Sequence, residues 1–280
     1  MTKFTFWAAV LIAILLLANV AVSADEAKEA YQKGEGYMEK KDFDAAIAAF
    51  TEAIRLDPKN ADAYFGRGVA YGCKGEYEKA VAEETEAIRL NPKLDLAYYN
   101  RGWAYGQTGK HDKAIADYTE AIRLNPKFAL TYCNRGLSYE NRGDHDKAIA
   151  DFSEAIRLDP NGVKAYESRG GAYDRKGDYD KAIADSTEAI RLNPKSSDAY
   201  RIRGAAYGCK GEYGKAIADF AEAIRLNPAF AAILILGAAT CLLLYWKVRR
   251  RRLLAYSNKG DKANADVDLA QAKKLGHKDQ

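Results

Sequence analysis

The sequence predicts an all-α solenoid, in which similar helix pairs stack side by side, on the basis of three observations. A 34-residue period runs without a gap from residue 27 to residue 230. Residues that end or bend helices recur at fixed places in that period, and between them apolar residues follow a helical spacing. Because one helix pair cannot bury both of its faces, neighbouring pairs must stack, and about three are usually needed for a stable array.

Six segments share the period, and each is expected to form one helix pair: 27–60, 61–94, 95–128, 129–162, 163–196 and 197–230. Glycine stands at the eighth position of every segment and tyrosine at the eleventh, beginning with Gly34 and Tyr37. Alanine recurs at positions 20 and 27. Every proline of the chain stands at position 32, in the order Pro58, Pro92, Pro126, Pro160, Pro194 and Pro228. The six segments are therefore expected to share one structure.

The third segment shows why each repeat should contain two helices. Upstream, Gly102 lies in a first helix and allows its partner to approach closely, and Gly109 serves the turn that follows. Pro126 ends the second helix, because proline lacks a backbone N–H and clashes with the preceding turn. One apolar face of the second helix, at spacings i, i+1, i+4, i+7 and i+8, is formed by Ala114, Ile115, Tyr118, Ala121 and Ile122.

These residues and their spacing resemble the tetratricopeptide repeat family over residues 27–230. The resemblance implies a right-handed solenoid of antiparallel helix pairs, whose first helices line a concave groove that binds proteins or extended peptides. The family has a large residue at position 24, whereas the second repeat has Glu84 and the fifth has Ser186. These two departures question tight packing at two junctions between repeats, but not the fold.

The resemblance also places positions 2, 5, 6, 9, 12 and 13 of each repeat on the groove. In the second to fourth repeats several of these positions carry apolar, aromatic or amide side chains. Aromatic rings supply surface for binding, and asparagine can donate to and accept from a peptide backbone. The predicted peptide-binding residues are Phe65, Val69, Leu96, Tyr99, Asn100, Trp103, Leu130, Cys133, Asn134 and Leu137. The alternative is that they only pack the solenoid.

Arginine recurs at position 7 of the second to sixth repeats, and two roles are open to it. A row of guanidinium groups can hold an anionic ligand. The interpretation we favour is that the arginines pack their stems and pair with neighbouring carboxylates. They are Arg67, Arg101, Arg135, Arg169 and Arg203.

The first 24 residues predict a secretory signal peptide or an uncleaved anchor. Lys3 precedes an uncharged stretch, and Val22, Ser23 and Ala24 are small residues suited to cleavage. The apolar run 4–22 is long for a signal, in which about 7–15 residues are usual. An uncleaved membrane anchor therefore remains an alternative.

A second apolar segment, 229–246, predicts a transmembrane helix. Its 18 uncharged residues span about 27 Å as a helix, close to the hydrocarbon thickness of about 30 Å. Trp246 ends the segment, and Lys247 and Arg249 to Arg252 follow, which is typical of a cytoplasmic flank. Together with the signal, this predicts a single-pass protein of the cell membrane with extracytoplasmic repeats and a cytoplasmic C-terminus.

The basic tail, 247–280, carries a partial seventh repeat, in which Tyr256 and Gly260 match positions 11 and 15. If that repeat packs on the solenoid, residues 229–246 form an unusually apolar soluble helix instead. We favour the membrane, because four arginines would stand at packing positions of the helix before Tyr256.

Catalysis, cofactors and metals are not expected. The chain has no glycine-rich phosphate loop, no nucleophile elbow and no His-Glu-x-x-His pair. His111 and His145 occupy a packing position, and no companion metal ligands accompany them. Cys73 and Cys209 stand four repeats apart, too far for a disulfide. The net charge of +4 is small, and no basic patch with interleaved aromatics indicates nucleic acid.

We therefore expect a non-catalytic scaffold that is anchored in a membrane through 229–246 and, if the leader is not cleaved, also through 4–22. It is expected to bind a protein or an extended peptide during envelope assembly or transport. The alternative is a transmembrane signalling receptor that couples partner binding to its basic cytoplasmic tail.

Overall fold

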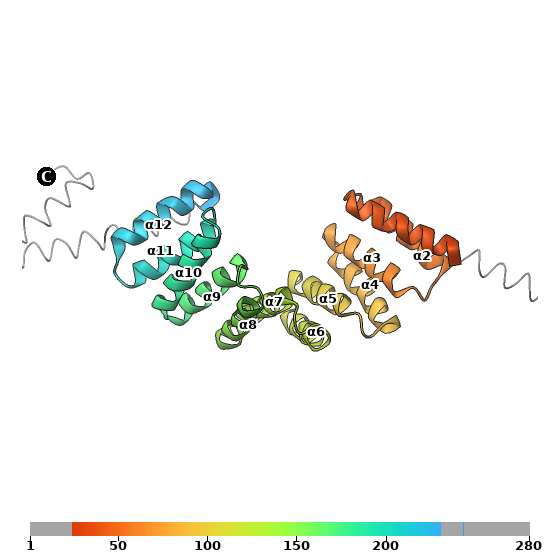
Figure 1. Cartoon of the computed structure of the whole chain (residues 1–280), viewed down its shortest axis with the longest axis horizontal. Helices are drawn as coiled ribbons and strands as arrows, with labels where there is room; N and C mark the ends of the chain where they lie inside the picture. The colour runs from red at the N-terminus through yellow and green to blue at the C-terminus, as the bar shows by residue number, and fades with distance from the viewer. Residues whose placement is uncertain (1–23, 231–242, 244–280) are drawn as a thin grey trace, which may run out of the picture. The chain divides into compact units, whose positions relative to one another are not determined.

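The computed structural model describes residues 24–230 and Leu243, and these residues form helices and turns without a strand (Figure 1). The described helices divide into two compact units, the first ending at Leu158 and the second beginning at Asp159. The boundary falls in the loop that closes the fourth repeat. Each unit is described by itself below.

The first unit contains a helix over residues 24–39, followed by α2 (Phe43–Leu56), α3 (Ala61–Cys73), α4 (Tyr77–Leu90), α5 (Asp95–Gln107), α6 (His111–Leu124), α7 (Ala129–Asn141) and α8 (His145–Leu158). The two helices of each repeat pack on each other, and the second helix also packs on the first helix of the next repeat. First helices of neighbouring repeats also touch, α3 with α5 and α5 with α7. This confirms the predicted solenoid of paired helices.

The second unit contains α9 (Val163–Lys176), α10 (Tyr179–Leu192), α11 (Ser197–Cys209), α12 (Tyr213–Leu226) and the short 3-10 helix η1 (Pro228–Phe230). Helices α9 and α10 form one pair and α11 and α12 the next, while α9 and α10 both contact α11. The same connectivity is therefore present in both units.

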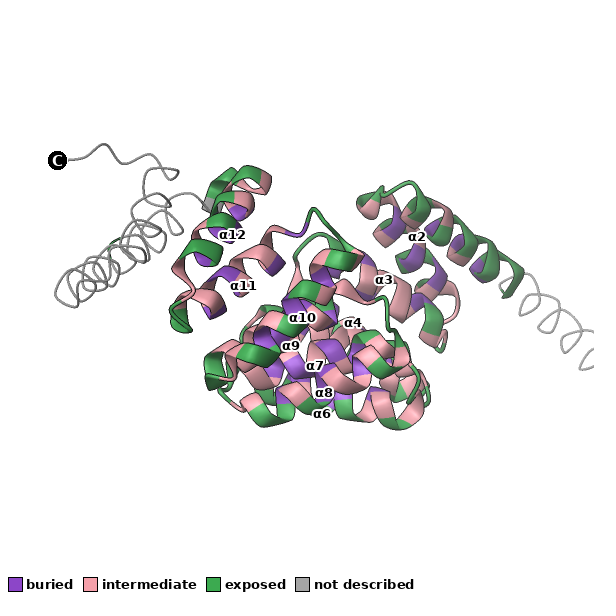
Figure 2. Ribbon diagram, turned by 60° about the vertical axis from the view of Figure 1, so that its left-hand side comes forward, coloured by how far each residue is buried: buried purple, intermediate pink, exposed green. Residues whose placement is uncertain are grey.

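Small residues bring the helices of each unit together. Residues coloured as buried lie on the parts of the ribbons that face neighbouring helices (Figure 2). Gly102 allows the close approach that its position predicts, because an added Cβ would lie 3.1 Å from the ring of Tyr118. Alanines at positions 20 and 27 are at most 3% exposed, and they are Ala46, Ala53, Ala80, Ala87, Ala114, Ala121, Ala148, Ala155, Ala182, Ala189, Ala216 and Ala223.

The turn between the two helices of a repeat requires one residue in the left-handed backbone conformation, with positive φ. Gly109 has φ +72°, which confirms its predicted place in the turn. Glycine avoids the steric cost that a Cβ brings at this backbone angle. The first repeat has Lys41 instead, at φ +59°. The other glycines with positive φ at this position are Gly75, Gly143, Gly177 and Gly211.

The arginines at position 7 connect repeats rather than forming a free anion site. Arg101 of α5 donates through Nε and Nη2 to both carboxylate oxygens of Asp117 in α6, at 2.8 Å each. Its Nη1 donates to Thr85 of α4 in the preceding repeat, at 3.1 Å. The guanidinium also lies over the ring of Tyr98, 5.7 Å from its centroid. One side chain thus ties three helices together.

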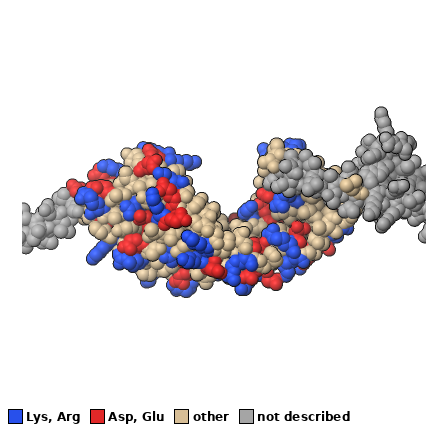
Figure 3. All heavy atoms as spheres, turned by 180° about the vertical axis from the view of Figure 1, so that it is seen from behind, with Lys and Arg blue, Asp and Glu red and all other residues tan. Residues whose placement is uncertain are grey.

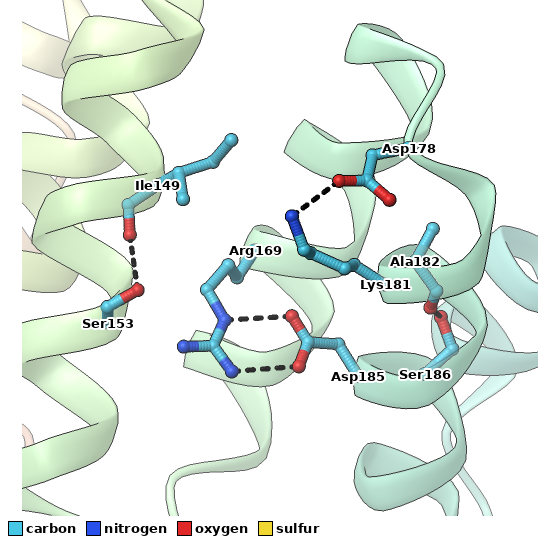
Figure 4. Close-up of polar contacts among 8 residues, drawn as sticks. All are labelled: Ile149, Ser153, Arg169, Asp178, Lys181, Ala182, Asp185 and Ser186. Atoms are coloured by element: carbon cyan, nitrogen blue, oxygen red, sulfur yellow. Dashed lines mark hydrogen bonds and ion pairs between the residues drawn. The ribbon is translucent and has the colours of Figure 1, made fainter.

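The same arrangement recurs within each unit. Arg135 donates to Asp151 at 2.8 Å and to Thr119 at 3.0 Å. Arg203 donates to Asp219 and Thr187 in the second unit. In the close-up of α9 and α10, Arg169 donates to both carboxylate oxygens of Asp185 (Figure 4). The expected pairing with carboxylates is confirmed.

Exposed charged side chains form ion pairs with oppositely charged neighbours on the same helix. Glutamate and arginine three residues apart pair on every second helix, as Glu120 does with Arg123 at 2.6 Å. Lys, Arg, Asp and Glu are consequently interspersed on the face drawn in Figure 3. Such exposed pairs each contribute little to stability, about 0–1 kcal/mol.

Among the helices that the structure describes, none is both long and apolar enough to cross a membrane. The predicted signal or anchor, 1–24, and the predicted span, 229–246, lie outside the described residues, apart from Ala24, Ala229, Phe230 and Leu243. The tail 247–280 lies outside them as well. Membrane insertion therefore stays a prediction.

We expect Asp117→Ala to lower the free energy of unfolding by about 2 kcal/mol, because it leaves the half-buried guanidinium of Arg101 without its carboxylate. The matched control is Glu120→Ala on the same helix, whose exposed pair with Arg123 should contribute about 0.5 kcal/mol or less. Urea titrations followed by circular dichroism measure both. Equal losses in the two variants would contradict a structural role for Arg101.

Candidate functional site

The predicted groove residues lie on α3, α5 and α7 of the first unit. Leu96 and Leu130 stand at the same position of neighbouring repeats, and their side chains are exposed, by 40% and 47%. Few large apolar side chains of the described residues are exposed to this degree. Two leucines in register on α5 and α7 therefore leave apolar surface open to a partner.

A pocket of about 240 Å³ is lined by residues of α3, α4 and α5. Val69 of α3 and Tyr99, Asn100 and Trp103 of α5 line it, so four of the predicted residues share one pocket. Helix α4 contributes Ala80 and Glu84 to the lining. The remaining lining residues, which the sequence did not single out, are Gly68, Gly72 and Cys73.

Trp103 reaches across the pocket from α5 to the preceding repeat. Its indole ring meets the ring of Tyr77 edge to face, with 5.5 Å between centroids. A Cβ added at Gly72 of α3 would lie 3.2 Å from the same indole. Trp103 therefore has a fixed position in the pocket wall, which suits a rigid binding surface.

Tyr99 has a packing role as well as a place in the pocket. Its ring lies 5.9 Å from the ring of Tyr118 and 5.1 Å from that of Phe128. Its hydroxyl oxygen accepts a hydrogen bond of 2.9 Å from the side-chain amide of Asn134. Burial raises the pKa of the Tyr99 hydroxyl. Tyr99 therefore packs the solenoid and also lines the pocket, so the packing and the binding interpretations both apply to it.

The other predicted residues divide by exposure. Cys133 is buried, with 5% of its surface exposed, so a ligand in the groove has little access to it. Phe65 and Leu137 are half-buried and are not part of the pocket lining. Asn134 is half-buried too, and its amide bonds Tyr99. The accessible part of the predicted set is therefore centred on α5.

Glu84 is the unusual feature of the pocket. It is 1% exposed, and neither carboxylate oxygen has a hydrogen-bond partner in the described part of the chain. Burial raises the pKa of the carboxyl well above its ordinary value, while the nearby Asn100 amide and Arg101 charge act in the opposite direction. A buried carboxyl without a partner is costly and is protonated in preference to carrying a charge.

Sequence reasoning marked Glu84 only as a departure in packing and missed it as a site residue. The available signal was an acid at position 24, where other repeats place Phe50, Tyr118, Phe152 and Phe220. The second departure, Ser186, is resolved differently. Its hydroxyl donates to the carbonyl oxygen of Ala182 at 2.7 Å, so its polar group is satisfied (Figure 4).

The side chains that line this pocket are suited to holding a ligand side chain. Apolar rings, an amide and one buried acid can hold a side chain, and the other ionisable side chains of the pocket lining are the thiol of Cys73 and the phenol of Tyr99. Within the part of the chain that the structure describes, no group of three or more metal-ligating side chains occurs.

Family models match the chain over residues 34–72 and 73–109 as TPR repeat, and over 96–128, 129–161 and 167–231 as tetratricopeptide repeat. The chain belongs to the tetratricopeptide repeat family. The predicted groove residues thus lie on the first helices of the second to fourth tetratricopeptide repeats, and the pocket is lined by the second and third repeats. A comparison with curated protein sequences finds no match.

Solved structures support the same assignment. MamA is 32% identical over 59% of this chain and 96% of its own, with a TM-score of 0.55. YrrB, described as a TPR protein with an unusual peptide-binding site, is 23% identical over 69% of this chain and 98% of its own, with a TM-score of 0.59. The pilF protein of Pseudomonas aeruginosa is 19% identical over 81% and 99%, with a TM-score of 0.65, and shares the fold.

We expect Glu84→Phe to raise the free energy of unfolding by about 2 kcal/mol at pH 7, because it removes a buried polar group without a partner. The ring should fit, since Tyr118 occupies the same position in the next repeat, where it lies against Gly102. The folded protein holds the Glu84 proton more tightly than the unfolded chain does. Wild-type stability therefore falls as pH rises from the ordinary glutamate pKa toward the raised one.

The increase in the free energy of unfolding caused by Glu84→Phe should therefore be larger at pH 7 than at pH 4. Urea titrations at both pH values measure it. Glu86→Gln, on the same helix, is the control, and it should change stability little at either pH because Glu86 lies at the surface and pairs with Arg89. A destabilised Glu84→Phe protein would show that the carboxyl does contribute to folding.

Proposed function

We propose that this chain is a non-catalytic scaffold that binds a protein or an extended peptide along α3, α5 and α7. The observation that carries the proposal is the pocket lined by Val69, Tyr99, Asn100 and Trp103. Leu96 of α5 and Leu130 of α7 add exposed apolar surface on the same series of first helices. An apolar surface with a few polar groups is typical of a binding site.

The chemistry of this surface suits an extended peptide. Apolar side chains of the peptide can cover the two leucines, and burying apolar surface contributes about 25 cal/mol per Å². Asn100 can bond peptide amides and carbonyls. Among proteins of the same fold, YrrB is described as having a peptide-binding site, and this agrees with the proposal.

Substitution of the two exposed leucines tests peptide binding without changing a buried side chain. We expect Leu96→Asn combined with Leu130→Asn to weaken binding of a fluorescent pool of degenerate decapeptides about tenfold, because apolar contact area is lost. Fluorescence anisotropy with the full chain in detergent micelles measures the affinity. Helicity should stay unchanged, since both side chains are exposed in the free protein.

Glu120→Asn combined with Glu154→Asn is the matched control, since both residues lie on second helices and pair locally with arginine. This variant should bind the pool as the wild type does. If the leucine variant binds equally well, the surface on α5 and α7 is not the binding site.

We further propose that the scaffold is anchored in the cell membrane with its repeats on the extracytoplasmic side, where it serves envelope assembly or transport. Support comes from the sequence at both ends: the leader 1–24, and the uncharged segment 229–246 followed by a basic cluster. The two features predict the same orientation.

Reporter fusions test this orientation. Alkaline phosphatase fused after Asn227 should be active, and a fluorescent protein that matures only in the cytoplasm should fluoresce when fused after Gln280. Active phosphatase with a dark tail would mean that 229–246 is exported with the repeats. Inactive phosphatase would place the repeats in the cytoplasm.

A further inference from the structure

We propose that the pocket above Glu84 receives a basic side chain of the bound peptide, an ammonium or guanidinium group on an apolar stem. This inference rests on the proposed function and adds a sequence preference to it. Lysine and arginine share the required chemistry.

The pocket exists because an acid stands where other repeats place a ring. Phe50 in the first repeat fills the corresponding space, so that a Cβ added at Gly34 or Gly66 would lie 2.5 or 2.6 Å from its ring. Glu84 has no ring to fill that space, and it is one of the residues that line the pocket found there. The substitution therefore creates a cavity and its polar group together.

The charged neighbours of Glu84 are engaged elsewhere. Arg101 donates to Asp117 and Thr85, and Glu83 accepts from Arg67 at 2.8 Å. The other ionisable side chains of the pocket lining are Cys73 and Tyr99, and neither a thiol nor a phenol forms a cation. Within the described pocket, no cation is therefore available to pair with this carboxyl.

The surrounding groove is also complementary to a basic peptide. The groove positions of the second to fourth repeats contain no lysine, arginine or histidine. They contain two acids, of which Asp62 is exposed and Glu140 is hydrogen-bonded to His145. An electrostatic bias of this sign favours cationic partners and disfavours acidic ones.

A basic side chain matches both the apolar wall of the pocket and the Glu84 carboxyl. Its methylene stem can pack on Val69 and Trp103, as long cationic side chains do on apolar surface, and Trp103 and Tyr99 present rings to the charge. The Glu84 carboxyl is 1% exposed in the free protein, so the entering cationic group must open the pocket to reach it, and the carboxylate then accepts hydrogen bonds from the ligand. An apolar side chain would fill the same volume but leave the carboxyl without a partner.

The test uses decapeptide pools that are degenerate except for a fixed central residue, which is lysine, arginine, norleucine or glutamate. Norleucine keeps an unbranched apolar stem of similar length to that of lysine and removes the charge. We expect at least one basic pool to bind the full chain about tenfold more tightly than the norleucine pool, and the glutamate pool to bind least tightly. Fluorescence anisotropy at pH 7 measures all four.

Glu84→Gln keeps the size of the side chain and should abolish the preference for the basic pool. Glu86→Gln makes the same change of charge on the exposed side of α4 and should retain it. Glu84→Phe fills the pocket and should also lose the preference, so the test does not depend on the folding of Glu84→Gln alone.

Three results would overturn the inference. If the wild type binds the basic and norleucine pools equally, the basic preference is wrong and the scaffold function stands. If Glu84→Gln and Glu84→Phe keep the preference, another group supplies it. If the wild type binds no pool, the proposed peptide-binding function fails, and this inference fails with it.

Discussion

The packing of each repeat depends on one side chain, at position 24 of the second helix, which fills the space between neighbouring first helices. Phe50 is 1% exposed and lies against Gly34 of its own repeat and Gly66 of the next. Glycine at these places removes the Cβ atoms that would collide with the ring. A change at position 24 therefore alters the junction between two repeats and the groove above it, while the helices themselves remain.

The position-7 arginines explain why such a junction survives the loss of its ring. Around Glu84, α4 and α5 are still joined by the hydrogen bond from Arg101 to Thr85, and α5 and α6 by its two bonds to Asp117. Buried alanines bring the same helices into contact. Because Arg101, Thr85 and Asp117 are not part of the pocket lining, a costly residue can stand at position 24 without separating the helices.

Much of this arrangement could be predicted from the sequence, because the repeat positions carry physical meaning. Gly109 and Pro126 indicated a turn and a helix end, and the family resemblance placed Tyr99, Asn100 and Trp103 on the groove. What could not be predicted was how a side chain divides its contacts. The burial of Cys133 and the bond from Asn134 to Tyr99 depend on distances between repeats, which periodicity does not give.

The role of Glu84 could not be predicted from the repeat pattern. Compared with the other repeats, an acid at position 24 only weakens the packing between repeats. At the level of the pocket, its carboxyl is the polar group that gives an apolar hollow a preference among ligands. Natural proteins break local rules mainly at functional sites and compensate elsewhere, and here Arg101 and the alanines compensate. A buried, unpartnered acid in a groove of a binding fold is thus better explained by recognition than by stability.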